Sequence, residues 1–278
     1  MEENILRCPV CGRGLQWAGN SLVCEQRHCF DRARQGYVNL LSVSQKHSKH
    51  PGDTRKMVAA RKSFLDQGYY TPIAEKTAEL ATSFLKDTPR ILDAGCGEGY
   101  YLSCLKDRLP NSHCIGIDIS KDAVRYAAVR NKDVLWLTAS AAHLPVMNES
   151  MDLVLSMFSL SVPDEFFRVL KPGGYYLEIT AGREHLMGLK SLIYPQIVEK
   201  AAKTAPEYSG FHRILDETLT FPLSLDSNPD IEQLLWMTPH VWRINQEGAQ
   251  RVKQATHLTD TAQVLFRLYR KVAQPNYV

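Results

Sequence analysis

Long apolar runs are missing from this 278-residue sequence: none approaches the roughly 18 consecutive apolar residues that a membrane-spanning helix needs. Its first residues, MEENILRCPV, also lack the basic and then apolar pattern of a signal peptide. A membrane or exported protein is therefore not expected, and we expect this chain in the cytoplasm. The 44% hydrophobic content can fill a core, and the length allows one large domain and a small one.

Cysteine is scarce and unevenly placed, which argues against a disulfide framework. There are seven cysteines, an odd number, and four of them fall within the first 29 residues. A reducing compartment keeps cysteines as thiols, so the group near the start is better explained as metal ligands.

Excess charge of either sign is also small, because the net charge is only +3. Between residues 27 and 62, however, nine basic residues stand against two aspartates. Such a basic segment is typical of a surface that meets phosphates, although a solvated linker explains the charge equally well. The nine residues are Arg27, Arg32, Arg34, Lys46, Lys49, Arg55, Lys56, Arg61 and Lys62.

Five short apolar runs alternate with helix-like stretches in the middle of the chain. They span residues 90–95, 113–118, 134–139, 152–157 and 175–180. Continuous apolar runs of strand length, separated by helices, are typical of a parallel sheet with helices on both faces. We therefore predict an α/β fold with a doubly wound, mostly parallel sheet.

A glycine-rich loop follows the first of these runs, in the sequence ILDAGCGEGY. Glycine permits tight turns and lets a ligand approach the main chain, as in nucleotide-like cofactor sites. A dinucleotide fingerprint needs another glycine where this chain has Tyr100, so NAD and FAD are disfavoured. Asp118, at the end of the second run and 21 residues after Gly97, can accept both ribose hydroxyls. The loop pattern is D-x-G-x-G-x-G, formed by Asp93, Gly95, Gly97 and Gly99.

This succession resembles class I S-adenosylmethionine-dependent methyltransferases, which implies a seven-stranded sheet. The resemblance also implies that Asp93 to Gly99 hold the methionine part of S-adenosyl-L-methionine, Asp118 the ribose, and Ala139 to Ala141 the adenine. Glycines that only form turns would not require the distant acid. The cofactor's sulfonium is already electrophilic, so the protein has to align the acceptor and remove a proton near it.

Four cysteines and one histidine near the start have the spacing of a zinc site. Cys8-x2-Cys11 and Cys24-x3-His28 are two pairs separated by twelve residues, as in structural sites closed by four tetrahedral ligands. A closed site stabilises a small fold and leaves no position for catalysis by bound water. Cys29 is an alternative fourth ligand that spacing alone does not exclude.

The chain from residue 8 to about 243 resembles one family closely, the bacterial large-subunit (23S) rRNA guanine-N1 methyltransferases. The matching stretches are CPVC, CEQRHCFDRARQGYVNLL, PGDT, ARKSFLDQGYYTP, ILDAGCGEGYY, VLKPGG, REHLMGLK and MTPHVWR. This resemblance implies a homodimer whose two zinc modules frame an RNA-binding cleft. It weakens over residues 156–167, where methyltransferases usually present the target base, and again after residue 245.

The resemblance also assigns site residues. Without it, a packed aromatic and a satisfied core histidine would be the preferred explanations of Tyr70 and His185. Its zinc ligands fall on Cys8, Cys11, Cys24 and His28, which leaves Cys29 as the spare. Its cofactor contacts fall on Tyr70, Gly97, Glu98 and His185.

We therefore expect methyl transfer from S-adenosyl-L-methionine to N1 of a guanine in a 23S rRNA hairpin. N1 lies on the Watson–Crick edge, so the base must be unpaired or flipped out of its stack. A small-molecule methyltransferase is the first alternative, but it leaves the zinc ligands and the basic segment unexplained. A non-enzymatic RNA-binding module is the second, and the intact glycines and Asp118 argue against it.

The group that accepts the N1 proton is not evident from the sequence. Asp164 and Glu165 are candidates, but DEFFRVLKPGG also reads as an ordinary amphipathic helix. Trp236 and Trp242 are candidates for stacking on bases, and a core role explains them as well.

Three regions follow from these patterns. Residues 1–44 are expected to form a zinc-binding, RNA-recognition domain of small strands, and residues 45–88 a basic hinge with two leading helices. Residues 89–278 are expected to form the methyltransferase domain, with substrate-side elements around 186–250. Within it, 185–202 looks helical, 230–244 looks like an aromatic helix or loop, and 211–225 and 255–272 look like strands.

Overall fold

The computed structural model describes residues 5–42, 45, 51–197 and 204–272, so Lys46 and Lys49 of the basic segment lie outside it. Near the N-terminus, three short strands form an antiparallel sheet in the order β1-β2-β3. These strands are β1 (Leu15–Ala18), β2 (Ser21–Cys24) and β3 (Cys29–Asp31). They confirm the expectation of small strands around the cysteines.

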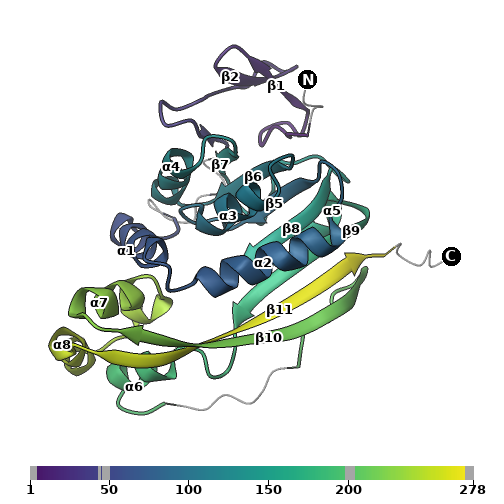
Figure 1. Ribbon diagram of the computed structural model, residues 1–278. Coiled ribbons are helices and arrows are strands. Elements are labelled where there is room, and N and C mark those ends of the chain that lie inside the picture. Colours follow the sequence, from purple (N-terminus) through teal and green to yellow (C-terminus); the bar gives the residue numbers. More distant parts are fainter. Residues whose placement is uncertain (1–4, 43–44, 46–50, 198–203, 273–278) are drawn as a thin grey trace.

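A second sheet of eight strands forms the centre of the molecule, in the order β10-β11-β9-β8-β5-β6-β7-β4 (Figure 1). Strands β4 to β9 run parallel, β11 is antiparallel to β9, and β10 is antiparallel to β11. Because the pattern of five buried runs predicted the parallel part, the doubly wound fold is confirmed. The bounds are β5 (Arg90–Ala94), β6 (His113–Asp118), β7 (Leu135–Thr138), β8 (Met151–Met157), β9 (Leu170–Ala181), β10 (Phe211–Leu225) and β11 (Leu258–Lys271).

The eighth strand, β4 (Val38–Asn39), comes from the N-terminal segment. Val38 pairs with Leu137 and Asn39 with Thr138 of β7. Seven strands, β5 to β11, form the sheet that the sequence predicted, and β4 extends it by one. The N-terminal segment is therefore attached to the edge of the catalytic sheet by backbone pairing.

Most of the helices pack on one face of the central sheet, and α5 packs on the other. Helix α1 starts behind Thr54, whose side chain accepts the N–H of Met57, and α2 starts with Thr71 and Pro72. The helices are α1 (Arg55–Asp66), α2 (Thr71–Phe84), α3 (Tyr100–Arg108), α4 (Lys121–Arg130), α5 (Pro163–Val169), α6 (Met187–Ile193), α7 (Asn228–Trp236), the 3-10 helix η2 (Pro239–Trp242) and α8 (Gln246–Gln254).

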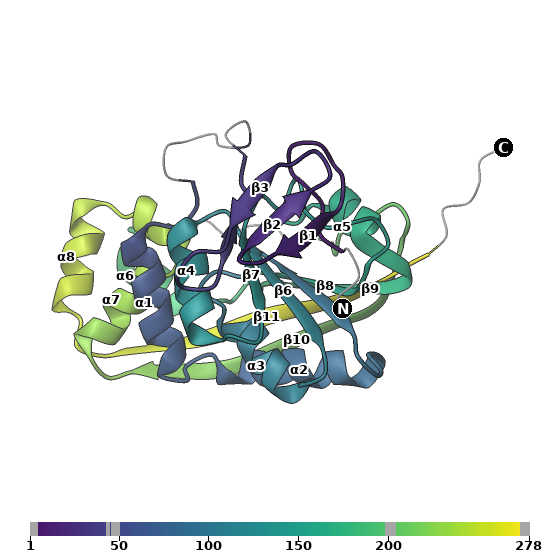
Figure 2. The same cartoon turned by 90° about the horizontal axis from the view of Figure 1, so that it is seen from above.

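Two apolar layers enclose the sheet. One contains Phe64, Leu102 and Val124 from α1, α3 and α4, together with residues of α2, α6, α7 and α8. The other contains Leu15 and Leu22 of the small sheet and residues of α5. Viewed from above, β1, β2 and β3 lie over the main sheet (Figure 2). The small sheet and α5 therefore cover that face of the main sheet.

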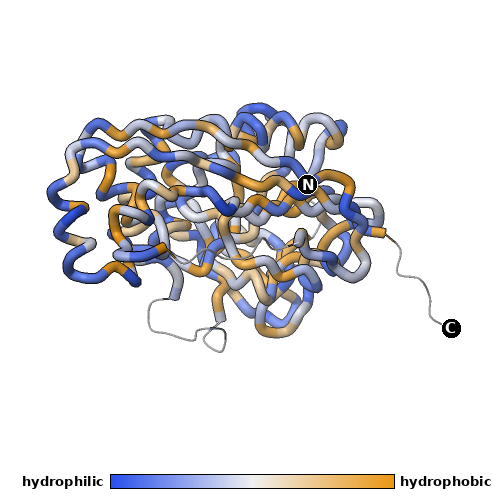
Figure 3. The backbone as a smooth tube through the Cα atoms, turned by 90° about the horizontal axis from the view of Figure 1, so that it is seen from below, coloured by the Kyte–Doolittle hydropathy of each residue, from blue (hydrophilic) through white to orange (hydrophobic). Residues whose placement is uncertain are grey.

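The tube coloured by hydropathy shows apolar residues interleaved through the central strands, whereas the outermost helix, α8, is mostly hydrophilic (Figure 3). None of the described helices is long and apolar enough to cross a membrane. Since the carboxyl ends of β5, β6, β7 and β8 lie on one edge of the sheet, a ligand site is expected there.

Candidate active site and metal centre

The glycine loop leaves β5 and enters α3 through three left-handed backbone conformations. Gly95, Gly97 and Gly99 have φ values of +102°, +55° and +84°, which other residues rarely adopt. A Cβ atom on Gly95 would lie 2.4 Å from Ser159, and one on Gly99 would lie 2.7 Å from Trp136. A Cβ on Gly97 would meet nothing in the described chain nearer than 3.6 Å. The loop is therefore packed from behind and open toward a large cleft in front.

Asp118 ends β6 and closes this cradle. Its Oδ2 accepts the backbone N–H of Gly97 at 2.9 Å, and its Oδ1 accepts that of Ser120 at 2.7 Å. A carboxylate has about four acceptor positions, so Asp118 can still accept the ribose hydroxyls of a ligand. Residues 139–142, which follow β7, line the same cleft where the adenine is expected.

Asp93 lies at the end of β5, beneath the loop, and is only 2% exposed. Its Oδ1 has no hydrogen-bond partner among the described residues. Burial, with the charge of Asp118 as the second cause, raises the pKa of Asp93 to about 8. A buried carboxylate oxygen without a partner fits a cationic ligand, and S-adenosyl-L-methionine carries an ammonium and a sulfonium group. The residues present therefore fit this cofactor.

Tyr70 and His185 also line the cleft and meet there, with Oη and Nε2 3.4 Å apart. Nδ1 of His185 accepts the backbone N–H of Gln263 at 3.2 Å, so the neutral ring carries its proton on Nε2, facing Tyr70. Burial, followed by the charge of Lys190, lowers the pKa of His185 to about 4 and keeps the ring neutral. The hydroxyl oxygen of Tyr70 accepts a hydrogen bond from this N–H, and the hydroxyl can donate a hydrogen bond to a ligand.

Glu98 and Gly99 differ from the other predicted cofactor residues in what they face. Glu98 is 1% exposed, and its Oε2 accepts Nε of Arg130 at 2.8 Å. Arg130 also pairs with Asp66 of α1 at 2.8 Å, so Glu98 fastens the loop to two helices. Gly99 lies behind the loop, whereas the other seven predicted residues line the cleft.

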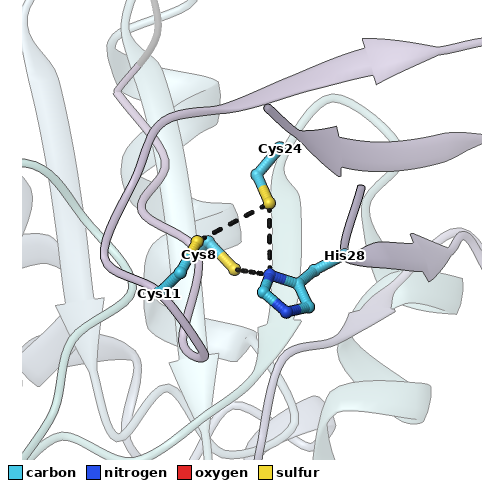
Figure 4. Close-up of side chains that lie close together, drawn as sticks. All are labelled: Cys8, Cys11, Cys24 and His28. Atoms are coloured by element: carbon cyan, nitrogen blue, oxygen red, sulfur yellow. Dashed lines mark hydrogen bonds between the residues drawn. The ribbon is translucent and has the colours of Figure 1, made fainter. Parts of the chain in front are cut away.

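The four predicted metal ligands converge at the N-terminal end (Figure 4), with their ligand atoms all within 4.8 Å of one another. Nδ1 of His28 lies 3.6 Å from Sγ of Cys8 and 3.3 Å from Sγ of Cys24, and Sγ of Cys11 lies 3.7 Å from that of Cys24. Tetrahedral zinc with Zn–S bonds of about 2.3 Å places sulfur atoms about 3.8 Å apart. The ligand atoms therefore fit the edges of a zinc tetrahedron.

Cys29 stands outside this cluster. Its side chain is exposed, and its Sγ lies 3.9 Å from Oδ1 of Asp31. The structure therefore brings His28, and not Cys29, to the other three ligands.

The hinge contributes cleft residues that the sequence did not reveal. Gly52 and Asp53 line the cleft, and the backbone oxygen of Asp53 accepts the hydroxyl of Ser120 at 2.8 Å. Arg61 pairs with Asp53 and donates to the backbone oxygen of Met237 at 3.1 Å. Arg61 belongs to the basic segment, and its guanidinium is held at the cleft by these two contacts. The only sequence signal for these cleft residues is the PGDT stretch. Its contact with the turn after β6 could not be predicted, because Ser120 lies far along the chain.

Other candidates from the sequence lie elsewhere. Oε1 of Glu165 pairs with Arg168 at 2.8 Å and its Oε2 accepts the N–H of Leu144 at 2.8 Å. Neither Asp164 nor Glu165 lines the cleft. The ring of Trp236 is covered by Lys56, whose Nζ lies 3.5 Å from its centroid, while Trp242 is 64% exposed and lines the cleft.

Together, fold and cleft define this chain as a class I S-adenosylmethionine-dependent methyltransferase. Comparison with protein families agrees: residues 6–49 match the family described as "RlmA, N-terminal", a zinc ribbon, and residues 91–174 match "Methyltransferase domain". The cofactors are therefore S-adenosyl-L-methionine and zinc.

Relatives extend the match to the whole chain. A 23S rRNA (guanine(748)-N(1))-methyltransferase of Streptomyces fradiae is 31% identical over 97% of this chain and 99% of its own. Two relatives named for 23S rRNA guanine-N1 methylation are 35% and 30% identical. The first, from Micromonospora griseorubida, covers 66% of this chain and 68% of its own, and the second, from Bacillus subtilis, 91% and 93%. The chain belongs to the 23S rRNA (guanine-N1)-methyltransferase family.

Proposed function

We propose that this enzyme transfers a methyl group from S-adenosyl-L-methionine to N1 of a guanine in a hairpin of 23S ribosomal RNA. The observation that carries the proposal is a zinc ribbon of this family packed on the sheet that bears the cofactor cleft. Since bacterial ribosomal RNA is made and modified in the cytoplasm, the enzyme is expected to act there.

The cofactor supplies an electrophilic methyl group, and the chain's own residues bind and orient it. Asp118 would accept the ribose hydroxyls, and the carboxylate of Asp93 would balance the positive charge of the cofactor's ammonium and sulfonium groups. The backbone of Gly95, Gly97 and Glu98 forms the cradle, which Gly99 allows to pack closely on Trp136. The hydroxyl of Tyr70, oriented by His185, donates to an acceptor group such as the cofactor's carboxylate.

Zinc is assigned to Cys8, Cys11, Cys24 and His28, where it closes the N-terminal module. Three thiolates and one imidazole complete a tetrahedral shell, so the metal has a structural role. It holds β1, β2 and β3 over the main sheet.

RNA binding is assigned to the exposed arginines of this module and of the adjoining helix. Arg27, Arg32 and Arg34 are exposed around β3, and Arg55 is exposed at the start of α1. Their charges suit the phosphate backbone, which contributes affinity without reading sequence.

We also propose a homodimer, in which two such modules frame one RNA-binding cleft.

The proposal is tested with purified enzyme, labelled S-adenosyl-L-methionine and unmodified fragments of 23S rRNA. A methyl group on N1 blocks base pairing, so primer extension should stop beside the modified guanine. Label transfer without a stop at any guanine would contradict the proposal. A fragment with that guanine replaced by adenine is the matched control.

A further inference from the structure

The proposed reaction needs a group that removes a proton from guanine. N1 carries a hydrogen and has no free lone pair in the neutral base, so it cannot attack a methyl group until this proton leaves. A carboxylate or imidazole within hydrogen-bond reach of the base is the usual acceptor. The need for this acceptor rests on the proposed function.

Most acidic groups described along the cleft are already engaged in holding the fold or the cofactor. Asp93 faces the cofactor, and Glu184 is exposed and accepts a bond from Gln263. The others are Asp53 on Arg61, Glu98 on Arg130, and Asp118 and Asp260 on backbone N–H groups.

The two cleft histidines are engaged as well. His185 is held between Gln263 and Tyr70, as described above, and Nδ1 of His240 lies 2.8 Å from the hydroxyl of Tyr194. Among the described carboxylates of the cleft, this leaves Glu178 of β9.

Glu178 is a buried carboxylate whose partners leave one oxygen largely free. It is 4% exposed and lines the cleft. Its Oε1 accepts the hydroxyls of Tyr208 at 2.7 Å and Tyr176 at 3.2 Å. Burial raises the pKa of both phenols, so they keep their protons and donate. Among the described residues Oε2 has one contact, with Nη1 of Arg267 at 3.4 Å, which leaves lone pairs for a proton.

Hydroxyl groups at and after the end of β8 contact both the strand that leads into the glycine loop and a tyrosine partner of Glu178. Glu178 pairs in register with Ser156 of β8. The hydroxyl of Ser156 lies 3.0 Å from that of Ser159, which donates to the backbone oxygen of Ala94 at 2.7 Å. On the other side, Ser161 lies 2.6 Å from the hydroxyl of Tyr176. The segment after β8 therefore touches both the cofactor cradle and the Glu178 cluster.

That segment also presents apolar side chains to the cleft. Phe158 is 42% exposed and Leu160 is 69% exposed, and both line the cleft. Phe158 has a φ of +51°, a strained conformation that is typical of functional sites when it occurs outside glycine. Exposed apolar groups beside a buried carboxylate suit a flat base, whose faces stack and whose polar edge needs an acceptor.

We propose that Glu178 is the catalytic base that takes the N1 proton of the target guanine. The N1–H bond breaks and its electron pair stays on N1, while the proton passes to Oε2 of Glu178. That pair then forms the new N1–CH3 bond, as the bond from carbon to the sulfonium breaks and sulfur keeps its electrons. The guanidinium of Arg267, beside the carboxylate, stabilises the negative charge that develops on O6 when the proton leaves.

The test compares Glu178→Gln with the wild type in single-turnover methylation of the 23S rRNA fragment. Glutamine keeps the shape of the side chain but cannot take the proton, so the rate at neutral pH should fall about 100-fold or more. It should recover in part at alkaline pH, where solvent removes the N1 proton, while affinity for S-adenosyl-L-methionine stays unchanged. Glu75→Gln, which alters an exposed carboxylate of α2 outside the cleft, should react like the wild type.

A second variant covers a failure of Glu178→Gln to fold. Tyr208→Phe leaves the carboxylate in place but removes the 2.7 Å hydrogen bond that orients it. The single-turnover rate at saturating RNA should therefore fall, while affinity for S-adenosyl-L-methionine and for the rRNA fragment stays unchanged. A folded Glu178→Gln protein with the rate and pH profile of the wild type, or a Tyr208→Phe protein with the rate of the wild type, would overturn the proposal. Both results presuppose an active wild type, and an inactive one would instead refute the proposed function.

Discussion

At the scale of single residues, the orientation of a side chain decides between His28 and Cys29 as the fourth metal ligand. Both have suitable chemistry, but β3 begins at Cys29 and directs its thiol to solvent, near Asp31. We expect Cys29→Ser to keep one zinc per chain and Cys24→Ser to lose it, because only Cys24 belongs to the cluster. Metal analysis of the gel-filtered proteins measures this ratio. Zinc loss from Cys29→Ser alone would assign the fourth ligand to Cys29.

Asp93 should make cofactor binding depend on pH. Its pKa of about 8 means that it is mostly protonated in the free protein at neutral pH. A cationic ligand favours the ionised form, so binding releases a proton and affinity rises as pH increases toward about 8. Calorimetry in buffers of different ionisation enthalpy counts this proton. Asp93→Asn should bind S-adenosyl-L-methionine more weakly, and the pH dependence of its affinity should reflect only the titration of the ligand. If affinity depended on pH in the same way in both proteins, Asp93 would not have this role.

The structure brings together the predicted residues whose spacing along the chain carries the information. The zinc pairs and the loop with its distant acid have fixed spacings, because each lies on one strand–turn unit or on consecutive units. Tyr70 and His185 were reached only through the family resemblance. The sequence did not reveal Glu178, because its proposed role depends on β8 and on Tyr208. These are brought beside it by the fold, and their distance along the sequence gives no sign of the contact.

At the scale of elements, the hinge before α1 is packed tightly on the turn after β6. Gly52 has a φ of +81°, and a Cβ there would lie 2.9 Å from Ile119 and 3.0 Å from Ser120. We expect Gly52→Ala to push the hinge away from Asp118 and to weaken cofactor binding about tenfold, a cost of about 1.4 kcal/mol. Calorimetric titration with S-adenosyl-L-methionine measures the change.

Gly19 provides the matched control for this substitution. It also has a positive φ, of +63°, but a Cβ there would meet nothing within 4 Å in the described chain. Gly19→Ala therefore adds similar backbone strain without a clash and should lower thermal stability while leaving cofactor affinity unchanged. Equal losses of affinity in the two variants would mean that strain, and not hinge packing, is responsible.

Elements with a strong pattern were predicted well, and weak ones were not. The central strands β5 to β8 are buried on both faces, so each appears as an apolar run, and 211–225 coincides with β10. Strand β4 has two residues and no periodicity, and only its pairing with β7 defines it. Of the stretch 185–202, helix α6 occupies 187–193, and residues 198–202 lie outside the described chain. The boundaries at residues 44 and 88 stay predictions.

At the scale of the whole molecule, the zinc module and the catalytic sheet share one apolar layer. Leu15 and Leu22 of the module belong to the same cluster as Leu92 and Ile117 of the sheet. The residues assigned to the cofactor, by contrast, lie at or beyond the ends of β5, β6, β7 and β9 and between α1 and α2. Loss of zinc should therefore remove the RNA-binding surface and part of the stability, and leave the cofactor cradle in place.

Removal of zinc with a chelator under reducing conditions tests this division. The melting temperature should fall by several degrees, because a small sheet without its metal cannot cover the face of the main sheet. Affinity for the rRNA fragment should drop about tenfold or more and lose most of its salt dependence, since the arginines around β3 are no longer positioned. Calorimetry below the lowered melting temperature should still show binding of S-adenosyl-L-methionine, and added zinc should restore RNA binding. If chelation abolished cofactor binding and RNA binding together, the module would be part of the catalytic fold itself; if it changed neither, the arginines of the module would not be the RNA contact.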